Sequence, residues 1–230
     1  IEGQTFGGET YPQDDANMMV YSQREPLGVV SVISPWNFPA SIPARKIAPA
    51  LITGNTIVFK PSSDAPLSGL RLVEALVEAG IPKGVINYIT GRAGDVGPII
   101  TTSKSIRAIS FTGSTQAGMH IHRTVHLTTR LQMELGGKNP LIVMEDADLD
   151  QAVELAIKGG FSLTGQACTG TSRVIVMKAV KEAFTKKLVE RVKTLKIGPG
   201  HQPGMDLGPL ATAKQLETVL HYLDIGRQEA

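Results

Sequence analysis

The alternation of short β-branched runs with helical patterns constrains the fold of this chain more than any other feature. Residues 27–34 (LGVVSVIS) and 55–62 (NTIVFKPS) have the composition of buried strands. Residues 41–54 and 66–80 have the apolar spacing of helices, and each stretch ends at a glycine. Strands that alternate with helices of this length form parallel βαβ units. We therefore expect an α/β fold built on a doubly wound parallel sheet.

The same scheme continues along the chain. Further strands are predicted at residues 84–90, 108–114, 139–146 and 171–177, with helices at 148–161 and 179–195. A second α/β unit is expected to begin near residues 136–140. The segment before Leu27 alternates loosely and predicts an extended arm or hairpin. In doubly wound sheets ligands bind at the carboxyl ends of the strands, so the loops that follow the strands are the candidate sites.

Composition excludes several function classes. The chain is 42% hydrophobic and 19% charged with a net charge of +2. It has no basic run that would suit nucleic acid or a membrane surface, and its apolar runs are too short to span a bilayer. His120 and His122 lie two residues apart on a predicted helix, which is poor spacing for metal ligands, so no metal is expected. The single cysteine permits no internal disulfide, which favours a reducing compartment such as the cytoplasm.

The ends of the sequence predict a fragment of a longer protein. The chain starts within a polar stretch without an initiator methionine. It stops in an amphipathic helical pattern that has no glycine or proline stop signal.

Two strand ends could hold a dinucleotide. In FTGSTQAG, the strand runs through Gly113 and Ser114 into a helix whose amino end suits a phosphate, although a serine or threonine that caps the helix explains the same pattern. In VFKPSSDAP, Lys60 could meet a phosphate or ribose, or could be a surface lysine beside a polar turn. Ser62 and Ser63 are small hydroxyls, which tolerate the 2′-phosphate of NADP better than a carboxylate would.

Three further residues could carry chemistry. Asn37, in the proline-bounded loop SPWNFPA, could supply an oxyanion-hole amide or could cap the next helix, with Trp36 as packing. Glu134 in QMELGGKNP would be partly desolvated, which suits a general base, or could pair with Lys138. Cys168 in FSLTGQACTGTSR is either a nucleophile or a small buried residue.

Taken together, the quoted motifs resemble those of the aldehyde dehydrogenase superfamily. MELGGKNP is similar to its glutamate signature and FSLTGQAC to its cysteine signature, while PWNFP, GNTIVFKPS and FTGST match in order. The likeness extends over essentially the whole chain. It implies an oligomerisation arm or hairpin at residues 1–26, most of a Rossmann-like NAD(P)-binding domain at 27–135, and the first part of a catalytic α/β domain at 136–230.

The resemblance also implies roles for individual residues. Cys168 would attack an aldehyde, Asn37 and the Cys168 backbone N–H would hold the oxyanion, and Glu134 would activate the water that hydrolyses the thioester. NAD or NADP would be the cofactor. Many NAD-specific relatives carry glutamate at the position of Ser63, so we expect NADP to be accepted. The implied cofactor-binding residues are Pro35, Trp36, Lys60, Ser62, Ser63, Gly97, Thr112, Gly113, Ser114 and Leu135.

Some features depart from the family pattern. Gly170 stands where alanine is common after Cys-Thr, and we expect the glycine to loosen the loop beside the nucleophile. The family's downstream motif Glu-Ile-Phe-Gly-Pro is not in the chain. We therefore expect little or no activity from this length of chain alone. The full-length protein would be a homo-oligomer, a dimer or tetramer, that acts on a small aldehyde. GRAGDVG and GQACTGTSR are similar to stretches of semialdehyde dehydrogenases of the 2-oxoglutarate or succinate semialdehyde type.

Two other functions are considered besides that of an aldehyde oxidiser. One is a catalytically silent module that keeps the fold for nucleotide binding or oligomerisation; the joint presence of Cys168, Glu134 and Asn37 argues against it. The other is a glyceraldehyde-phosphate-type dehydrogenase, which needs a histidine base close after the cysteine. The first histidine after Cys168 is His201, so this alternative ranks lower.

Overall fold

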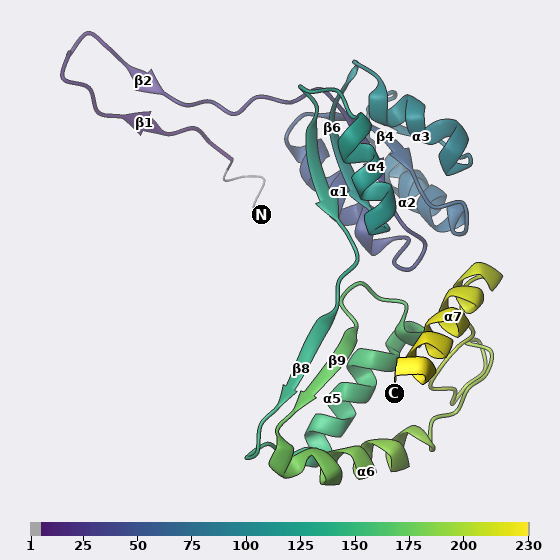
Figure 1. The fold of residues 1–230 in the computed structure, drawn as a ribbon. Helices are drawn as coiled ribbons and strands as arrows, with labels where there is room; N and C mark the ends of the chain where they lie inside the picture. The colour runs from purple at the N-terminus through teal and green to yellow at the C-terminus, as the bar shows by residue number, and fades with distance from the viewer. Residues whose placement is uncertain (1–5, 230) are drawn as a thin grey trace. The chain divides into compact units, whose positions relative to one another are not determined.

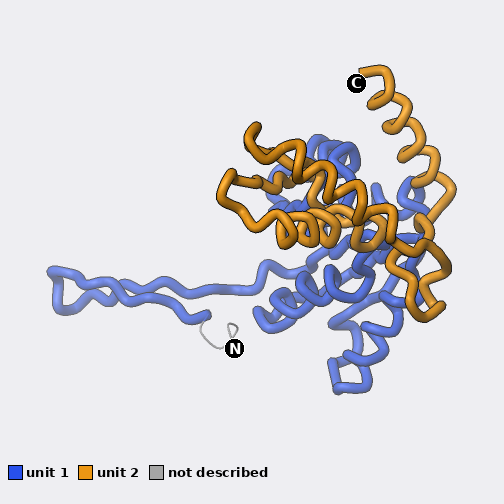
Figure 2. Tube along the Cα trace, turned by 90° about the horizontal axis from the view of Figure 1, so that it is seen from below, with its two compact units in different colours: residues 1–136 blue, residues 137–230 orange. Residues whose placement is uncertain are grey.

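The computed structural model describes residues 6–229 (Figure 1). The chain divides into two compact units, residues 1–136 and residues 137–230, drawn in blue and orange in Figure 2. Each unit has its own buried apolar cluster, as independent α/β units require.

The first unit is built on a five-stranded sheet in the order β5-β4-β3-β6-β7. All neighbouring strands in this sheet pair in parallel. Their bounds are β3 Val29–Ile33, β4 Thr56–Lys60, β5 Ile86–Tyr88, β6 Ile106–Thr112 and β7 Arg130–Glu134. The expected α/β fold with a parallel sheet is confirmed.

Helices cover both faces of this sheet. They are α1 Ser41–Ile52, α2 Pro66–Glu78, α3 Ala93–Thr102 and α4 Thr115–Thr124. On one face, Ile47 of α1 and Val73 of α2 pack on Ile57 and Phe59 of β4. On the other face, Ile121 of α4 packs on β6. Because β3 contributes to both clusters, it is buried from both sides, which explains its near-continuous apolar sequence.

The segment before the sheet forms a short antiparallel hairpin from β1 Thr10–Tyr11 and β2 Val20–Tyr21 (Figure 1). Tyr11, Met18, Met19 and Tyr21 are exposed on it. The hairpin that the sequence predicts is therefore present, and it displays large apolar side chains.

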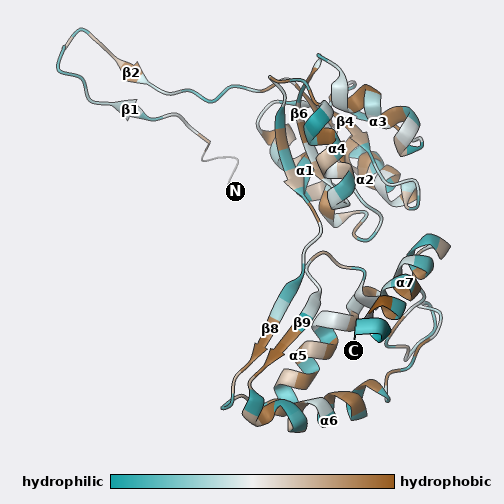
Figure 3. Cartoon of the chain, viewed as in Figure 1, coloured by the Kyte–Doolittle hydropathy of each residue, from teal (hydrophilic) through white to brown (hydrophobic). Residues whose placement is uncertain are grey.

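The second unit contains a two-stranded parallel sheet of β8 Asn139–Val143 and β9 Thr171–Val176. Helix α5 Leu149–Phe161 connects the two strands through the 3₁₀ turn η2 Ser162–Gly165; η3 Lys178–Val180, α6 Lys181–Val192 and α7 Ala213–Glu229 follow. Figure 3 shows that the later residues of both strands are hydrophobic. Val143 packs with Val153 and Ile157 of α5 and Phe184 of α6, which forms the core of this unit.

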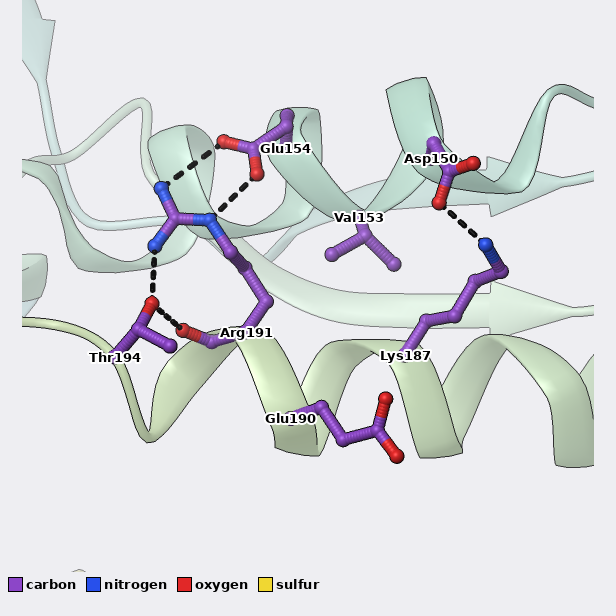
Figure 4. A pocket seen from close by; sticks show the side chains of 7 residues that line it. All are labelled: Asp150, Val153, Glu154, Lys187, Glu190, Arg191 and Thr194. Carbon is purple, nitrogen blue, oxygen red and sulfur yellow. Dashed lines mark hydrogen bonds and ion pairs between the residues drawn. The ribbon is translucent and has the colours of Figure 1, made fainter.

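Two ion pairs link the exposed sides of α5 and α6 (Figure 4). Lys187 pairs with Asp150, and Arg191 donates from Nε and Nη2 to the two oxygens of Glu154. The hydrogen bond to Asp150 raises the pKa of Lys187. Since the charged groups that line this shallow pocket are largely paired with one another, the pocket is an unsuitable ligand site.

The first core cluster generates a test of the fold. Ile57 of β4 is fully buried, whereas Ile52 at the end of α1 is 63% exposed. We expect Ile57→Ala to lower the free energy of unfolding by about 2–5 kcal/mol, because it leaves a cavity between sheet and helix. Ile52→Ala is the matched control, with an expected change within about 0.5 kcal/mol. Urea denaturation measures both, and equal losses would contradict this packing.

Candidate active site

The strand order creates a crevice at one position of the first sheet. The chain moves from β3 to β4 on one side and later places β6 on the other side of β3. The loop after β3 and the turn after β6 therefore leave the same edge in opposite directions, the position at which doubly wound sheets bind ligands. Asn37, Gly113 and Ser114 belong to these two connections.

Asn37 lies in the half-buried loop after β3, with Pro35 and Trp36 before it. Its Oδ1 accepts a hydrogen bond of 3.1 Å from the backbone N–H of Phe38. The N-cap residue of α1 is Ala40, which is three residues further along. The position of the helix start does not support the alternative in which Asn37 caps it.

The turn after β6 is more constrained than the sequence indicates. The Gly113 N–H donates to the Glu134 carbonyl oxygen at 3.1 Å, so this amide is already bonded. A Cβ at Gly113 would lie 2.5 Å from Cζ of Phe111, which requires glycine here. Ser114 is the N-cap of α4 and accepts from the Ala117 N–H at 3.2 Å. The capping alternative is thus confirmed for Ser114, and an anion would have to use the remaining amides of the first turn.

Lys60 is 5% exposed, so the alternative of a surface lysine is wrong. Its Nζ donates to the Pro61 carbonyl oxygen at 3.1 Å, and burial lowers its pKa. Lys60 lines a cavity of about 450 Å³ between α3 and α4, together with Gly94, Gly97 and Ala117. An apolar cavity with one lysine suits a flat base beside a ribose or phosphate.

The turn after Lys60 contains a carboxylate as well as the two serines. Ser63 Oγ donates to the Gly91 carbonyl oxygen at 3.1 Å. Ser62 Oγ accepts from the Asp64 N–H at 3.2 Å. Asp64 is exposed, one residue beyond Ser63, so a carboxylate lies next to the two serines in sequence.

Two buried hydroxyls at the crevice have no hydrogen-bond partner among the described residues. They are Ser34 Oγ, just after β3, and Thr112 Oγ1, at the end of β6. Buried hydroxyls are normally bonded, so both can accept a partner that enters the crevice. The cavity beside Lys60, which Ile33 of β3 and Phe111 of β6 also line, lies at the same strand ends and is large enough for part of a dinucleotide. Leu135 packs in the cluster around Ile121 that supports α4.

Glu134 ends β7, the edge strand of the sheet, and its side chain is exposed in this structure. The expected partial desolvation is therefore not provided by the first unit, because an edge strand has a neighbour on one side only. Glu134 Oε1 accepts from Gln132 Nε2 at 3.0 Å. Gln132 in turn bonds Lys46 of α1, at 3.0 Å.

Lys46 was missed by the sequence analysis. It is 8% exposed, and burial lowers its pKa to about 8, while the charge of Glu134 acts in the opposite direction. A lysine on the sheet-facing side of an apolar helix (ARKIAPAL) is the signal that could have identified it.

Cys168 belongs to the second unit and is exposed, so the alternative of a small buried residue is wrong. Asn139 at the start of β8 donates from Nδ2 to the carbonyl oxygens of Cys168 and Gly170, at 2.9 and 3.2 Å. The Gly170 N–H also donates to the Ala167 carbonyl oxygen at 3.1 Å. These bonds hold the backbone of the thiol loop while the side chain stays accessible.

Gly170 fills a tight position in this loop. A Cβ there would lie 3.2 Å from the Ala167 carbonyl oxygen and 3.3 Å from that of Gly159. The expectation that glycine loosens the loop does not fit this packing, since the backbone around it is close on two sides.

Strained backbone precedes the thiol. Leu163 and Thr164 have φ of 52° and 59°, and Gly165 has φ of 70°. Thr164 Oγ1 donates to the Gly208 carbonyl oxygen at 3.0 Å, which ties this turn to a distant segment. Left-handed leucine and threonine are costly, so such contacts are needed to hold them.

Other classes of site are not found in the described part of the chain. Residues 6–229 contain no group of three His, Cys, Asp or Glu side chains placed to hold a metal ion. Among the same residues, no helix has the length and apolar character to cross a membrane.

A family model described as the aldehyde dehydrogenase family matches residues 2–230. The chain is 48% identical to 2,5-dioxopentanoate dehydrogenase of Saccharolobus solfataricus, over 96% of this chain and 47% of that protein. It is 43% identical to alpha-ketoglutaric semialdehyde dehydrogenase of Bacillus subtilis, over 99% of this chain and 47% of that protein. The chain thus spans about half the length of the curated relatives it matches.

Solved structures agree with these relatives. Betaine aldehyde dehydrogenase of Staphylococcus aureus in complex with NAD+ matches with a TM-score of 0.96 at 37% identity, over 100% of this chain and 46% of that one. An NADP-dependent enzyme of E. coli matches with the same TM-score at 39% identity, over 100% of this chain and 48% of that one.

The buried Lys46 predicts a pH dependence of stability. Its pKa is about 8 when folded against 10.5 for a free lysine, so the unfolded chain binds more protons between these values. The free energy of unfolding should therefore gain a contribution as the pH rises from about 8 towards 10.5. Lys46→Met should remove this gain while the similar effect of Lys60 stays in both proteins. Urea denaturation at pH 7.5 and pH 10 tests it, and equal pH slopes in both proteins would contradict it.

Proposed function

Because this chain belongs to the aldehyde dehydrogenase family, we propose that its protein oxidises an aldehyde to a carboxylic acid with NAD or NADP. The observation that carries the proposal is the exposed Cys168 thiol on a loop whose backbone is held by Asn139. A thiol in an accessible, fixed loop suits a nucleophile, whereas structural cysteines are usually buried and inert.

The first bond-making step is assigned to Cys168. Its thiolate attacks the aldehyde carbon, and the carbonyl oxygen becomes an oxyanion. We assign Asn37 and the Cys168 backbone N–H as the donors to this oxyanion, since fixed donors lower the barrier of such a step. Bound NAD or NADP supplies the acceptor for the hydride that leaves the substrate carbon. The oxyanion then re-forms a carbonyl group, as a thioester on Cys168.

Glu134 completes the reaction as the general base. It takes a proton from water, whose oxygen adds to the thioester carbon. The carbon–sulfur bond breaks, the carboxylic acid leaves, and the Cys168 thiolate is restored.

The adenosine and phosphate end of the cofactor would bind to the first unit. Lys60, Gly97 and the first turn of α4 would hold its adenosine and phosphate groups, and Thr112 Oγ1 would gain a partner. We propose that Ser63 leaves room for a 2′-phosphate, so that NADP is accepted.

We further propose a semialdehyde of a dicarboxylic acid as substrate, of the kind that the names of the two curated relatives describe. The exposed apolar side chains of the β1–β2 hairpin support contacts between subunits of a homo-oligomer. A catalytic thiol must stay reduced, which favours the cytoplasm.

A direct test is formation of NADH or NADPH with 2-oxoglutarate semialdehyde and a panel of other aldehydes, using the full-length protein. Cys168→Ala should abolish turnover, because it removes the nucleophile. Ser105→Ala, an exposed substitution ahead of β6, is the control and should leave the rate unchanged. Turnover that survives in Cys168→Ala would overturn the mechanism. A protein that binds NADP but oxidises no aldehyde would favour the silent nucleotide-binding module.

Cofactor choice gives a second test. Ser63→Glu should lower the ratio of kcat/KM for NADP to that for NAD by about tenfold or more, because a carboxylate repels the 2′-phosphate. Ser105→Glu adds the same charge away from the site and should leave the ratio unchanged. A wild-type protein with strong preference for NAD would contradict the role given to Ser63.

A further inference from the structure

The carboxylate of Glu134 is bonded to a neighbour on its own strand. Gln132 and Glu134 are two residues apart on β7, so their side chains project from the same face. Gln132 Nε2 donates to Glu134 Oε1 at 3.0 Å. The amide of Gln132 is therefore in direct contact with the group that we assign as the base.

The other end of the Gln132 amide is bonded from two elements. Ser110 of β6 is paired with Gln132 in the sheet register, and its Oγ donates to Gln132 Oε1 at 2.6 Å. Lys46 of α1 donates from Nζ to Ser110 Oγ and to Gln132 Oε1, at 3.0 Å each. The amide is thus anchored to a buried lysine and to the adjacent strand.

This arrangement leaves the amide one orientation. A charged lysine only donates and an ionised carboxylate only accepts. If the amide were turned over, its NH₂ group would face Lys46 and its oxygen would face Glu134, and both bonds would be lost. Lys46 and Ser110 therefore determine that the NH₂ group of Gln132 points at Glu134.

The amide also separates opposite charges. An ammonium in direct contact with a carboxylate holds it in the charged form and makes it a poorer proton acceptor. A neutral amide orients the carboxylate with a weaker interaction. Gln132 thus connects the Glu134 carboxylate to the buried Lys46 and orients it, without a direct ion pair between Lys46 and Glu134.

We propose that Gln132 is a positioning residue for thioester hydrolysis, which holds Glu134 in the orientation that activates water. This inference rests on the proposed function, because it takes Glu134 as the base and Cys168 as the nucleophile.

Hydrolysis can be measured separately from hydride transfer. In the full-length protein, the Cys168 thiolate displaces 4-nitrophenolate from 4-nitrophenyl acetate, so that a carbon–sulfur bond forms as the ester bond breaks. After excess ester is removed, the decay of acetylated Cys168 is followed by intact-mass spectrometry. Water gives a proton to Glu134 and its oxygen adds to the acetyl carbon, which releases acetate and the thiolate.

Two substitutions separate positioning from packing. Gln132→Glu keeps the shape and the acceptor for Lys46 and Ser110 but loses the donor to Glu134. Gln132→Leu loses both the acceptor for Lys46 and Ser110 and the donor to Glu134. We expect each variant to slow decay of the acetyl adduct by about tenfold or more, as loss of a hydrogen bond to a charged group implies. Gln151→Leu on the exposed side of α5 is the matched control and should decay at the wild-type rate.

A double variant provides the decisive comparison. If Gln132 acts through Glu134, Gln132→Leu should slow decay no further once Glu134→Gln is present. If the slowing by Gln132→Leu multiplies with that by Glu134→Gln in the double variant, the proposal is overturned, since Gln132 then has a general structural role. Wild-type decay in Gln132→Glu, with a thermal midpoint near that of the wild type, would also overturn it. Absence of an adduct on wild-type Cys168 would refute the nucleophile and, with it, both the proposed function and this inference.

Discussion

The parallel pairing of β3 with β4 on one side and β6 on the other is the constraint on which the rest of the first unit depends. It buries β3 on both faces and sends the following connections away from each other. Asn37 follows β3 and Thr112 ends β6, so both residues lie at the edge of the sheet where these connections diverge. Ser34 and Thr112 are left with buried hydroxyls that a ligand can satisfy. The geometry of the candidate cofactor site is thus a consequence of strand order.

Two buried lysines lie on opposite faces of this sheet and have different roles. Burying a lysine costs free energy unless its donors are bonded, and both meet this condition in different ways. Lys60 bonds one backbone carbonyl and lines the cavity between α3 and α4. Lys46 is on the sheet-facing side of α1 and bonds Ser110 and Gln132. The first lysine therefore suits ligand binding, and the second supports the polar network that reaches Glu134.

In the second unit, the thiol loop depends on contacts from outside itself. Leu163 and Thr164 occupy left-handed conformations that cost about 1–2 kcal/mol each. The bond from Thr164 to the Gly208 carbonyl oxygen helps to offset this cost, and the bonds from Asn139 hold the next turn at Cys168 and Gly170. The strained turn at residues 163–165 is followed by the hydrogen-bonded turn at residues 167–170, in which the Cys168 side chain is exposed. The loop is therefore defined by segments that lie far from it in sequence.

The sequence by itself determined most of the order of strands and helices along the chain, because apolar periodicity is a local property. It also identified Cys168, Asn37 and Glu134 as chemically suited residues from the short motifs around them. Only the tertiary structure decided that Lys60 is buried, that Glu134 lies on an exposed edge strand, and that Gln132 joins Glu134 to Lys46. These outcomes depend on which strands become neighbours and which helix covers them. Gln132 and Lys46 are brought together by folding, and no local pattern records such a contact.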